Sequence, residues 1–168
     1  MDEDVTKRIV DATWKKLLIV CAANVATPVI YVVLGVVLLK SGFQPVAEPL
    51  GGDVVQYIFA GLIALSVLLY LAARTLRAKL LTAERVAKYR GDLNRVAQHF
   101  TSITIVTMAI AEMGAVGGLV LFILTTELVP LAVLAGLSVL CALLMFPSRT
   151  KLEELMQAAV RREDDASC

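Results

Sequence analysis

Four long apolar runs, separated by polar segments, dominate the chain. They cover residues 17–39, 54–73, 103–125 and 128–146. Each is close to the roughly 20 residues that a helix needs to cross a hydrocarbon core about 30 Å thick. Because backbone amides in hydrocarbon must find partners within their own segment, runs of this length favour helices over strands. The sequence therefore predicts an all-α, polytopic membrane protein in which four transmembrane helices form two hairpins within a single domain, residues 1–168.

The polar segments after the second and fourth runs are predicted to contain short amphipathic helices. In segment 74–99, apolar residues recur at helical spacing until Gly91 interrupts the pattern: Leu76, Leu80, Ala83 and Ala87. After Pro147 ends the fourth run, Thr150 and Glu153 form a capping-box pattern that predicts a helix over residues 150–162. The apolar stripe of that helix is Leu152, Leu155, Met156 and Ala159. These helices either lie on the anionic inner leaflet, extend the spans and pack on one another, or bind a partner.

The distribution of positive charge predicts the orientation. Of the 16 Lys and Arg residues, Lys40 alone follows the first run, and the others fall in the N-terminal segment, in segment 74–99 and in the C-terminal tail. Cytoplasmic loops carry the excess of Lys and Arg in membrane proteins. We therefore expect a multi-pass protein of the cell inner membrane with a cytoplasmic N-terminus and C-terminus. The outer loop, residues 41–53, contains two prolines and three glycines and is predicted to be irregular.

Several function classes find no support in the sequence. Cys21 and Cys141 lie inside apolar runs, Cys168 is the last residue, and neither a CxxC pair nor metal-ligand spacing with the single His99 is present. The sequence contains no nucleophile–base pair and no phosphate-binding loop. Topology already explains the basic loop, so nucleic acid is not an expected partner. The sequence predicts no enzyme, no cofactor and no metal site.

Glu112 is the one charged residue inside the apolar runs. It lies nine positions into the third run, about 14 Å deep at 1.5 Å per residue. A carboxylate at that depth costs several kcal/mol unless it is protonated, paired or hydrated. Because the runs contain neither Lys nor Arg, Glu112 is expected either to be neutral for most of the time or to face a polar pocket that holds a cation or water.

The other runs supply polar groups at a similar depth: Asn24, Ser66 and Ser138. Pro28 displaces the hydrogen bond to the carbonyl four residues earlier, which belongs to Asn24. We expect Asn24, Glu112 and a serine to form one polar cluster that binds an ion or carries a proton. The alternative is that the serines bond to their own helices and Asn24 satisfies only the kink.

The third run is rich in small residues around Glu112. Gly114 and Gly118 form a GxxxG pair, which permits close approach of two helices. The pair predicts packing against the first or fourth span, or alternatively an oligomer contact.

Residues 111–120, Ala-Glu-Met-Gly-Ala-Val-Gly-Gly-Leu-Val, resemble the carboxylate helix of the rotary ATPase proteolipids, the c-subunits. In that helix an Ala-Glu step is followed by a small residue three positions on and by Gly-Leu-Val at six to eight. Glu112, Ala115 and residues 118–120 match in register. The resemblance implies that Glu112 binds and releases a transported proton or sodium ion.

Two functions remain open. The first is a proteolipid-like membrane protein whose buried Glu112 binds or passes a proton or sodium ion. The second is a structural or assembly subunit, a scaffold of a membrane complex, in which Glu112 pairs with a partner helix. The expected partners are the lipid bilayer and either further copies of the chain or other membrane subunits.

Overall fold

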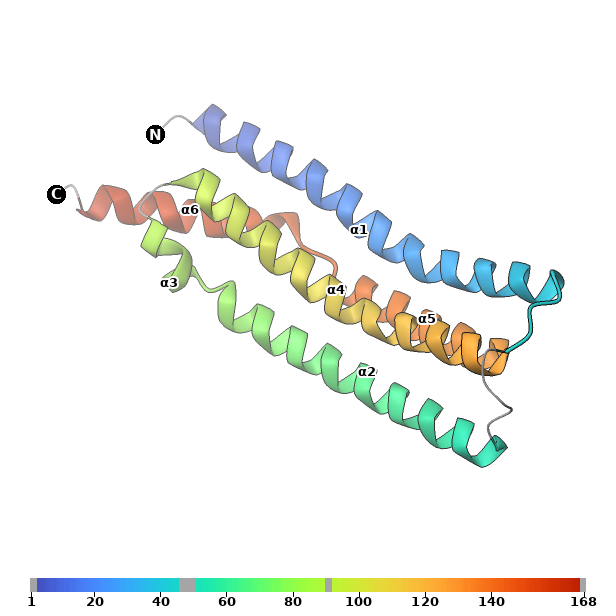
Figure 1. The fold of residues 1–168 in the computed structure, drawn as a ribbon. Coiled ribbons are helices and arrows are strands. Elements are labelled where there is room, and N and C mark those ends of the chain that lie inside the picture. Colours follow the sequence, from blue (N-terminus) through green and yellow to red (C-terminus); the bar gives the residue numbers. More distant parts are fainter. Residues whose placement is uncertain (1–2, 46–50, 90–91, 167–168) are drawn as a thin grey trace.

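The structure, a computed structural model, describes residues 3–45, 51–89 and 92–166, and the regular structure within them is helical. Figure 1 shows the elements in chain order: α1 (Glu3–Lys40), α2 (Gly52–Leu80), α3 (Ala83–Val86), the 3₁₀ turn η1 (Ala87–Tyr89), α4 (Leu93–Thr125), α5 (Leu128–Leu144) and α6 (Arg149–Ala166). The predicted all-α class is confirmed. The predicted break at Gly91, outer-loop residues 46–50 and Cys168 lie outside the described residues.

Three helices, α1, α2 and α4, are long and apolar enough to cross a membrane. A fourth candidate is α5 together with α6, which follows it at an angle of 42°. By itself α5 has 17 residues, or about 26 Å of helix. It ends two residues before the end of the fourth apolar run, because the residue before a proline is disfavoured in helical conformation and Pro147 follows.

The central helix of the bundle is α4, which packs against α1, α2 and α5. Figure 1 shows α1 on one side of it and α2 on the other, and α5 packs against both α4 and α1. In the most apolar stretch of each helix, 44% of the residues of α4 are buried, compared with 17% in α1 and 6% in α2. Most residues in that stretch of α2 are therefore not buried by the rest of the described chain.

Three helices continue beyond their apolar runs at one end of the bundle: α1 and α4 begin earlier than the runs, and α2 ends later. With α3, η1 and α6 they enclose a core outside the apolar runs, which we call the end core. It includes Val10, Leu81, Val86, Val96, Phe100, Leu152, Leu155 and Met156. The four residues predicted to form the stripe of the C-terminal helix are all buried there. That prediction is confirmed, and the stripe packs on the neighbouring helices of the same chain.

Two local expectations were wrong. The repeat in segment 74–99 does not form one helix, because α2 ends at Leu80 and α3 begins at Ala83 after a break. Buried Leu81 lies in this break and contributes to the end core, so tertiary packing outweighs the local repeat. The capping box is also absent: α6 begins at Arg149, and Glu153 forms an ion pair of 2.8 Å with Arg149.

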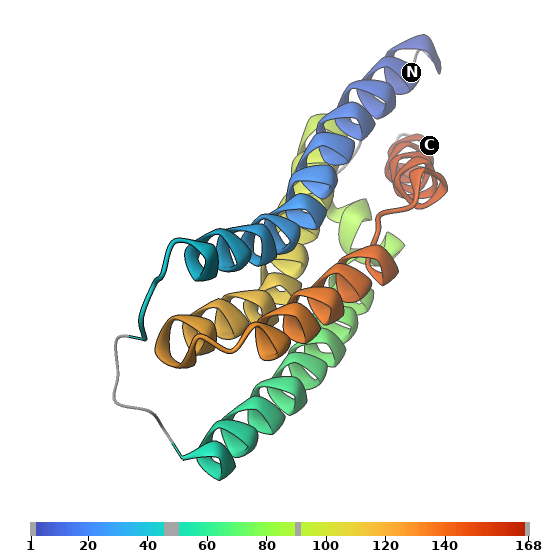
Figure 2. The same cartoon turned by 90° about the vertical axis from the view of Figure 1, so that its right-hand side faces the viewer.

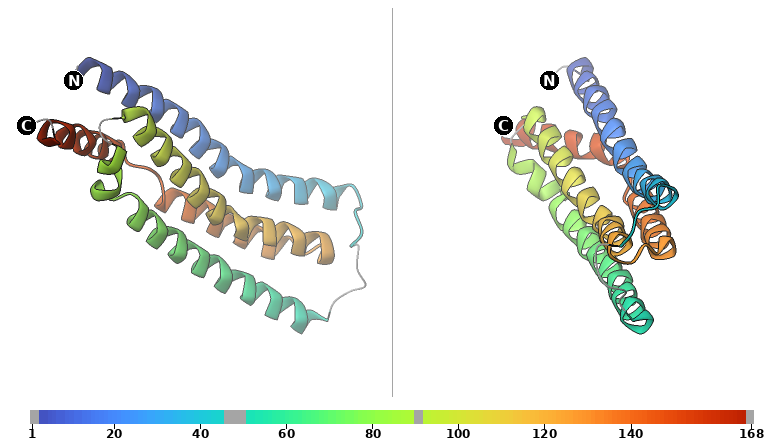
Figure 3. Two further views of the ribbon diagram at one scale, coloured as in Figure 1. Left: turned by 60° about the vertical axis from the view of Figure 1, so that its left-hand side comes forward. Right: turned by 45° about the vertical axis from the view of Figure 1, so that its right-hand side comes forward.

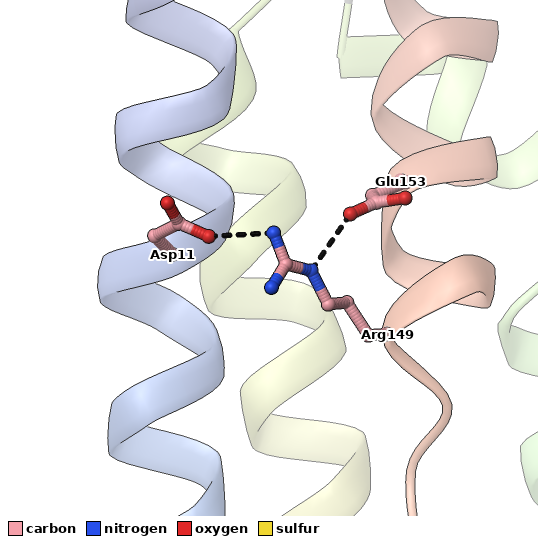
Figure 4. Close-up of polar contacts among 3 residues, drawn as sticks. All are labelled: Asp11, Arg149 and Glu153. Atoms are coloured by element: carbon pink, nitrogen blue, oxygen red, sulfur yellow. Dashed lines mark hydrogen bonds and ion pairs between the residues drawn. The ribbon is translucent and has the colours of Figure 1, made fainter.

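Arg149 also connects α6 to α1. Its guanidinium forms an ion pair of 2.7 Å with Asp11 and lies between that carboxylate and Glu153 (Figure 4). The hydrogen bond to Glu153 and the nearby Asp11 charge raise the pKa of Arg149. All three side chains are about half exposed, so we expect this contact to orient α6 more than to stabilise the fold.

Candidate functional site

Glu112 lies in the middle of α4, 13 residues before the last residue of the helix, Thr125, which is about 20 Å along the axis. Its Oε1 atom is buried and has no hydrogen-bond partner among the residues that the structure describes. Buried polar atoms nearly always have a partner, because an unpaired one loses its interaction with water without replacement. The Oε1 atom is therefore the feature of this bundle that most requires a chemical explanation.

The register of α4 places Glu112 at the boundary between its packed face and its open face. Residues three and four positions apart are neighbours on a helix surface. On one side of Glu112, Met108 and Ala115 are buried, with exposed fractions of 1% and 0%. On the other side, Ala109 and Val116 are exposed. The carboxyl group thus has one oxygen within the protein while the adjacent side of the helix faces the surroundings.

The structure brings the two predicted serines together, one from α2 and one from α5, at Gly114. A Cβ atom on Gly114 would lie 2.6 Å from Ser66 Oγ and 3.0 Å from Ser138 Oγ. The missing side chain therefore makes room for both hydroxyls. The Ala115 N–H donates to Ser138 Oγ at 2.9 Å, and Ser66 Oγ donates to the Leu62 carbonyl of its own helix at 2.7 Å.

These hydroxyls do not hydrogen-bond to Glu112. Gly114 follows Glu112 by two residues, which is about 200° around the helix axis at ~100° per residue. Ser66 and Ser138 thus lie at the depth of Glu112 but on another face of α4.

Asn24 also lies at a similar depth to Glu112. It belongs to α1, which packs along a different side of α4 from the two serines. Gly35 of α1 lies against Phe122 of α4, since a Cβ atom on it would be 3.6 Å from Phe122 Cζ. The two helices run in the same direction (Figure 1). Asn24 and Glu112 therefore lie at nearly equal distances, 11 and 10 residues, from this contact.

The Asn24 side chain hydrogen-bonds to its own helix. Its Nδ2 donates to the Val20 carbonyl at 2.9 Å, and no hydrogen bond joins it to Glu112 within the described part of the chain. Pro28 is buried inside α1, and Figure 2 shows that the helix is bent. Of the four candidates, the structure thus brings Ser66 and Ser138 together at Gly114. It places Asn24 and Glu112 at one level without a hydrogen bond between them.

The glycine pair of α4 packs within the chain. A Cβ atom on Gly118 would lie 3.0 Å from Leu134 Cβ and 3.3 Å from Leu131 Cα, both of α5. Together with the serines at Gly114, this contact fixes how α4 and α5 are rotated against each other. It therefore determines where Glu112 points.

Arg77 is a residue whose role the sequence did not indicate. Its Nη1 donates to the carbonyl of Met145, the C-cap residue that directly follows α5. A cation at a helix C-terminus satisfies a free carbonyl and interacts favourably with the helix dipole. Its spacing is the feature of the sequence that could have indicated this role. Arg77 follows buried Ala73 by four residues and therefore continues the packed face of α2.

Comparison of the chain with protein-family models, with curated proteins and with solved structures gave no match.

Proposed function

We propose that this chain is a four-pass inner-membrane protein in which Glu112 takes up and releases a proton. In this proposal α5 is the fourth span, both termini are cytoplasmic, and α6 with the neighbouring helix ends lies at the inner surface. The 15 Lys and Arg residues other than Lys40 then belong to the cytoplasmic side, as the distribution of charge in membrane proteins requires.

The observation that carries the proposal is the buried Oε1 of Glu112, which has no hydrogen-bond partner in the described part of the chain. An ionised carboxylate at this depth would need a cation or several donors, whereas a protonated carboxyl is neutral and can remain there. Such a group needs only occasional access to water to exchange its proton. The boundary position of Glu112 supports that access. The resemblance of residues 111–120 to a proton-carrying or sodium-carrying helix supports the role of Glu112 as the exchanging group.

A proton is better supported than sodium. A hard cation is held by several converging oxygen atoms, whereas one oxygen atom suffices for a proton. The two serine hydroxyls identified by the sequence lie at Gly114, about 200° around α4 from Glu112, and both take part in hydrogen bonds with backbone groups.

The test is proton flux into vesicles. Purified protein is reconstituted with an internal pH dye, and a potassium diffusion potential drives proton entry. We expect flux with the wild type, none with Glu112→Gln, and wild-type flux with the matched control Glu127→Gln, which changes an exposed carboxylate at the turn between α4 and α5. Absence of flux from folded wild-type protein, or equal flux from wild type and Glu112→Gln, contradicts the proposal.

Carbodiimide labelling provides an independent measurement, because the reagent reacts with protonated carboxyl groups in apolar surroundings. We expect mass spectrometry to find the adduct on Glu112 and the labelling rate to fall as pH rises. Protection by sodium at constant pH would instead identify sodium as the ligand.

The second candidate function, a structural subunit in which Glu112 pairs with a partner helix, is favoured by the exposed residues beside Glu112. Met113 and Val116 are 55% and 38% exposed, so a second helix could approach there. In that case Glu112→Gln would abolish co-purification with a membrane partner, and wild-type vesicles would show no flux.

A further inference from the structure

An open groove of about 560 Å³ lies where α2 ends, between that helix and the start of α6. Figure 3 shows α6 and α3 grouped at this end of the bundle. The groove is lined by Arg74, Arg77, Ala78, Leu81, Thr82 and Lys151. We call it the basic groove, since three of these six residues are cations and none is acidic.

The three cations are held in different ways. Arg77 is fixed by its hydrogen bond to the Met145 carbonyl, which uses one of the five N–H donors of a guanidinium. Lys151 forms an exposed ion pair of 3.2 Å with Glu154. Arg74 has no ion pair within the described residues. The groove therefore combines one positioned guanidinium with two cations that can adjust to a ligand.

The position of the groove along the bundle also indicates which ligand it suits. Arg74 directly follows the apolar run 54–73, so in the proposed membrane orientation the groove opens where hydrocarbon meets the lipid headgroups. Ala78 and Leu81 supply an apolar wall beside the cations. Basic pockets between helices at this level are suited to anionic lipid headgroups.

We propose that the basic groove binds the phosphate group of an anionic lipid from the inner leaflet. Arg77 donates to the phosphate oxygens from a fixed position, Arg74 and Lys151 close around them, and the Thr82 hydroxyl is a further donor. The acyl chains extend toward the hydrocarbon along Leu71 and Val67, which precede Arg74 by three and seven residues on the same face of α2 and are 48% and 42% exposed. Free phosphate shares the headgroup chemistry but has nothing to place against this exposed apolar face of α2, which favours the lipid. This site depends on membrane insertion of α2 and is independent of Glu112.

The experiment measures lipid retention by the full-length protein. Detergent-solubilised protein is incubated with phosphatidylglycerol or with phosphatidylcholine, and bound lipid is counted by native mass spectrometry. We expect preferential retention of phosphatidylglycerol. The variant Arg74→Gln/Lys151→Gln should weaken it by about fivefold per removed cation, while Arg77 is kept because it also caps α5.

The matched control is Arg85→Gln/Lys88→Gln, which removes the same charges from a neighbouring groove that also contains Glu84. This control should bind phosphatidylglycerol as the wild type does. An equal loss in both variants would show diffuse attraction to basic surface and would overturn the proposal, as would equal retention of the two lipids by the wild type. Displacement of the lipid by millimolar inorganic phosphate would assign the groove to free phosphate instead. Proton flux measured on the groove variant should be unchanged, so the groove and Glu112 can fail separately.

Discussion

Replacement of Gly118 by alanine should separate α4 from α5. The added Cβ atom would lie 3.0 Å from Leu134 Cβ and 3.3 Å from both Leu131 Cα and Leu134 Cδ1. Two of these three atoms are a Cα and a Cβ, which cannot rotate away. The helices must therefore move apart by a few tenths of an ångström, and that movement reaches every contact of the α4–α5 interface, including the bond from Ala115 N–H to Ser138.

The expected cost follows from two opposing contributions. Overpacking of a filled interface costs about 1–3 kcal/mol, whereas alanine in place of glycine in a helix gains about 0.5–1 kcal/mol. Gly136 of α5 provides the matched control, because a Cβ atom there meets nothing within 4 Å. Gly136→Ala receives the helical gain alone. The free energies of unfolding of the two variants should thus differ by about 1–3 kcal/mol, with Gly118→Ala the less stable.

The assay is reversible unfolding in mixed micelles of increasing dodecyl sulfate content, followed by fluorescence of Trp14. This single tryptophan packs edge-on against Phe146, with ring centroids 6.4 Å apart, and therefore reports contact between α1 and the end of α5. Equal unfolding midpoints for Gly118→Ala and Gly136→Ala would refute the close approach of α4 and α5. A more stable Gly118→Ala would refute it even more directly.

Three further outcomes are expected. Leu155 is 1% exposed in the end core, so Leu155→Ala leaves a cavity there. The variant should lower the free energy of unfolding by about 2–5 kcal/mol, measured by urea unfolding of the protein in micelles. A loss of less than about 1 kcal/mol would contradict that packing. Gly117→Ala should be tolerated although its Cβ atom would lie 2.9 Å from Leu62 Cδ2, because that methyl group is the far end of a flexible side chain. A loss of stability in dodecyl sulfate comparable to that of Gly118→Ala would show that Leu62 cannot move. Arg149→Gln should leave the thermal midpoint unchanged at physiological salt, since its partners are exposed. Because the pKa of Arg149 is raised, deprotonation of the guanidinium removes any contribution of these ion pairs at strongly alkaline pH alone, and a decline of the wild type relative to the variant between pH 6 and 9 would contradict this assignment.

The sequence was sufficient to predict the helices but not all of their ends. Twenty apolar residues in hydrocarbon have few alternatives to a helix, and the runs are helical in the structure. The extensions at Glu3 and Leu93 have no such constraint. They are helical where an apolar stripe packs into the end core. The helix is interrupted at Leu81, whose side chain is buried in that core. Contacts between distant segments determine these boundaries, and local spacing does not reveal them.

The candidate site shows a different limit. Counting residues along a helix gives the depth of a side chain, and the four polar candidates were predicted to share one depth. The direction in which each points depends on how the helices rotate against one another. That rotation is fixed by contacts such as Gly114 with Ser66 and Ser138, which one sequence cannot provide.

This rotation also restricts how a proton could reach Glu112. The Gly114 side of α4 is occupied by α2 and α5, whose serine hydroxyls are engaged with backbone groups. Glu112 points about 200° away from that side, and α1 is the other helix that packs extensively on α4. Exchange through the serines would require breaking the α4–α5 contact, whereas exchange beside α1 requires only movement of a helix that is already bent and that contains Pro28. In the proposed function, we therefore expect the proton path to Glu112 to lie along the α1 side of α4, at the boundary where its packed face meets its open face.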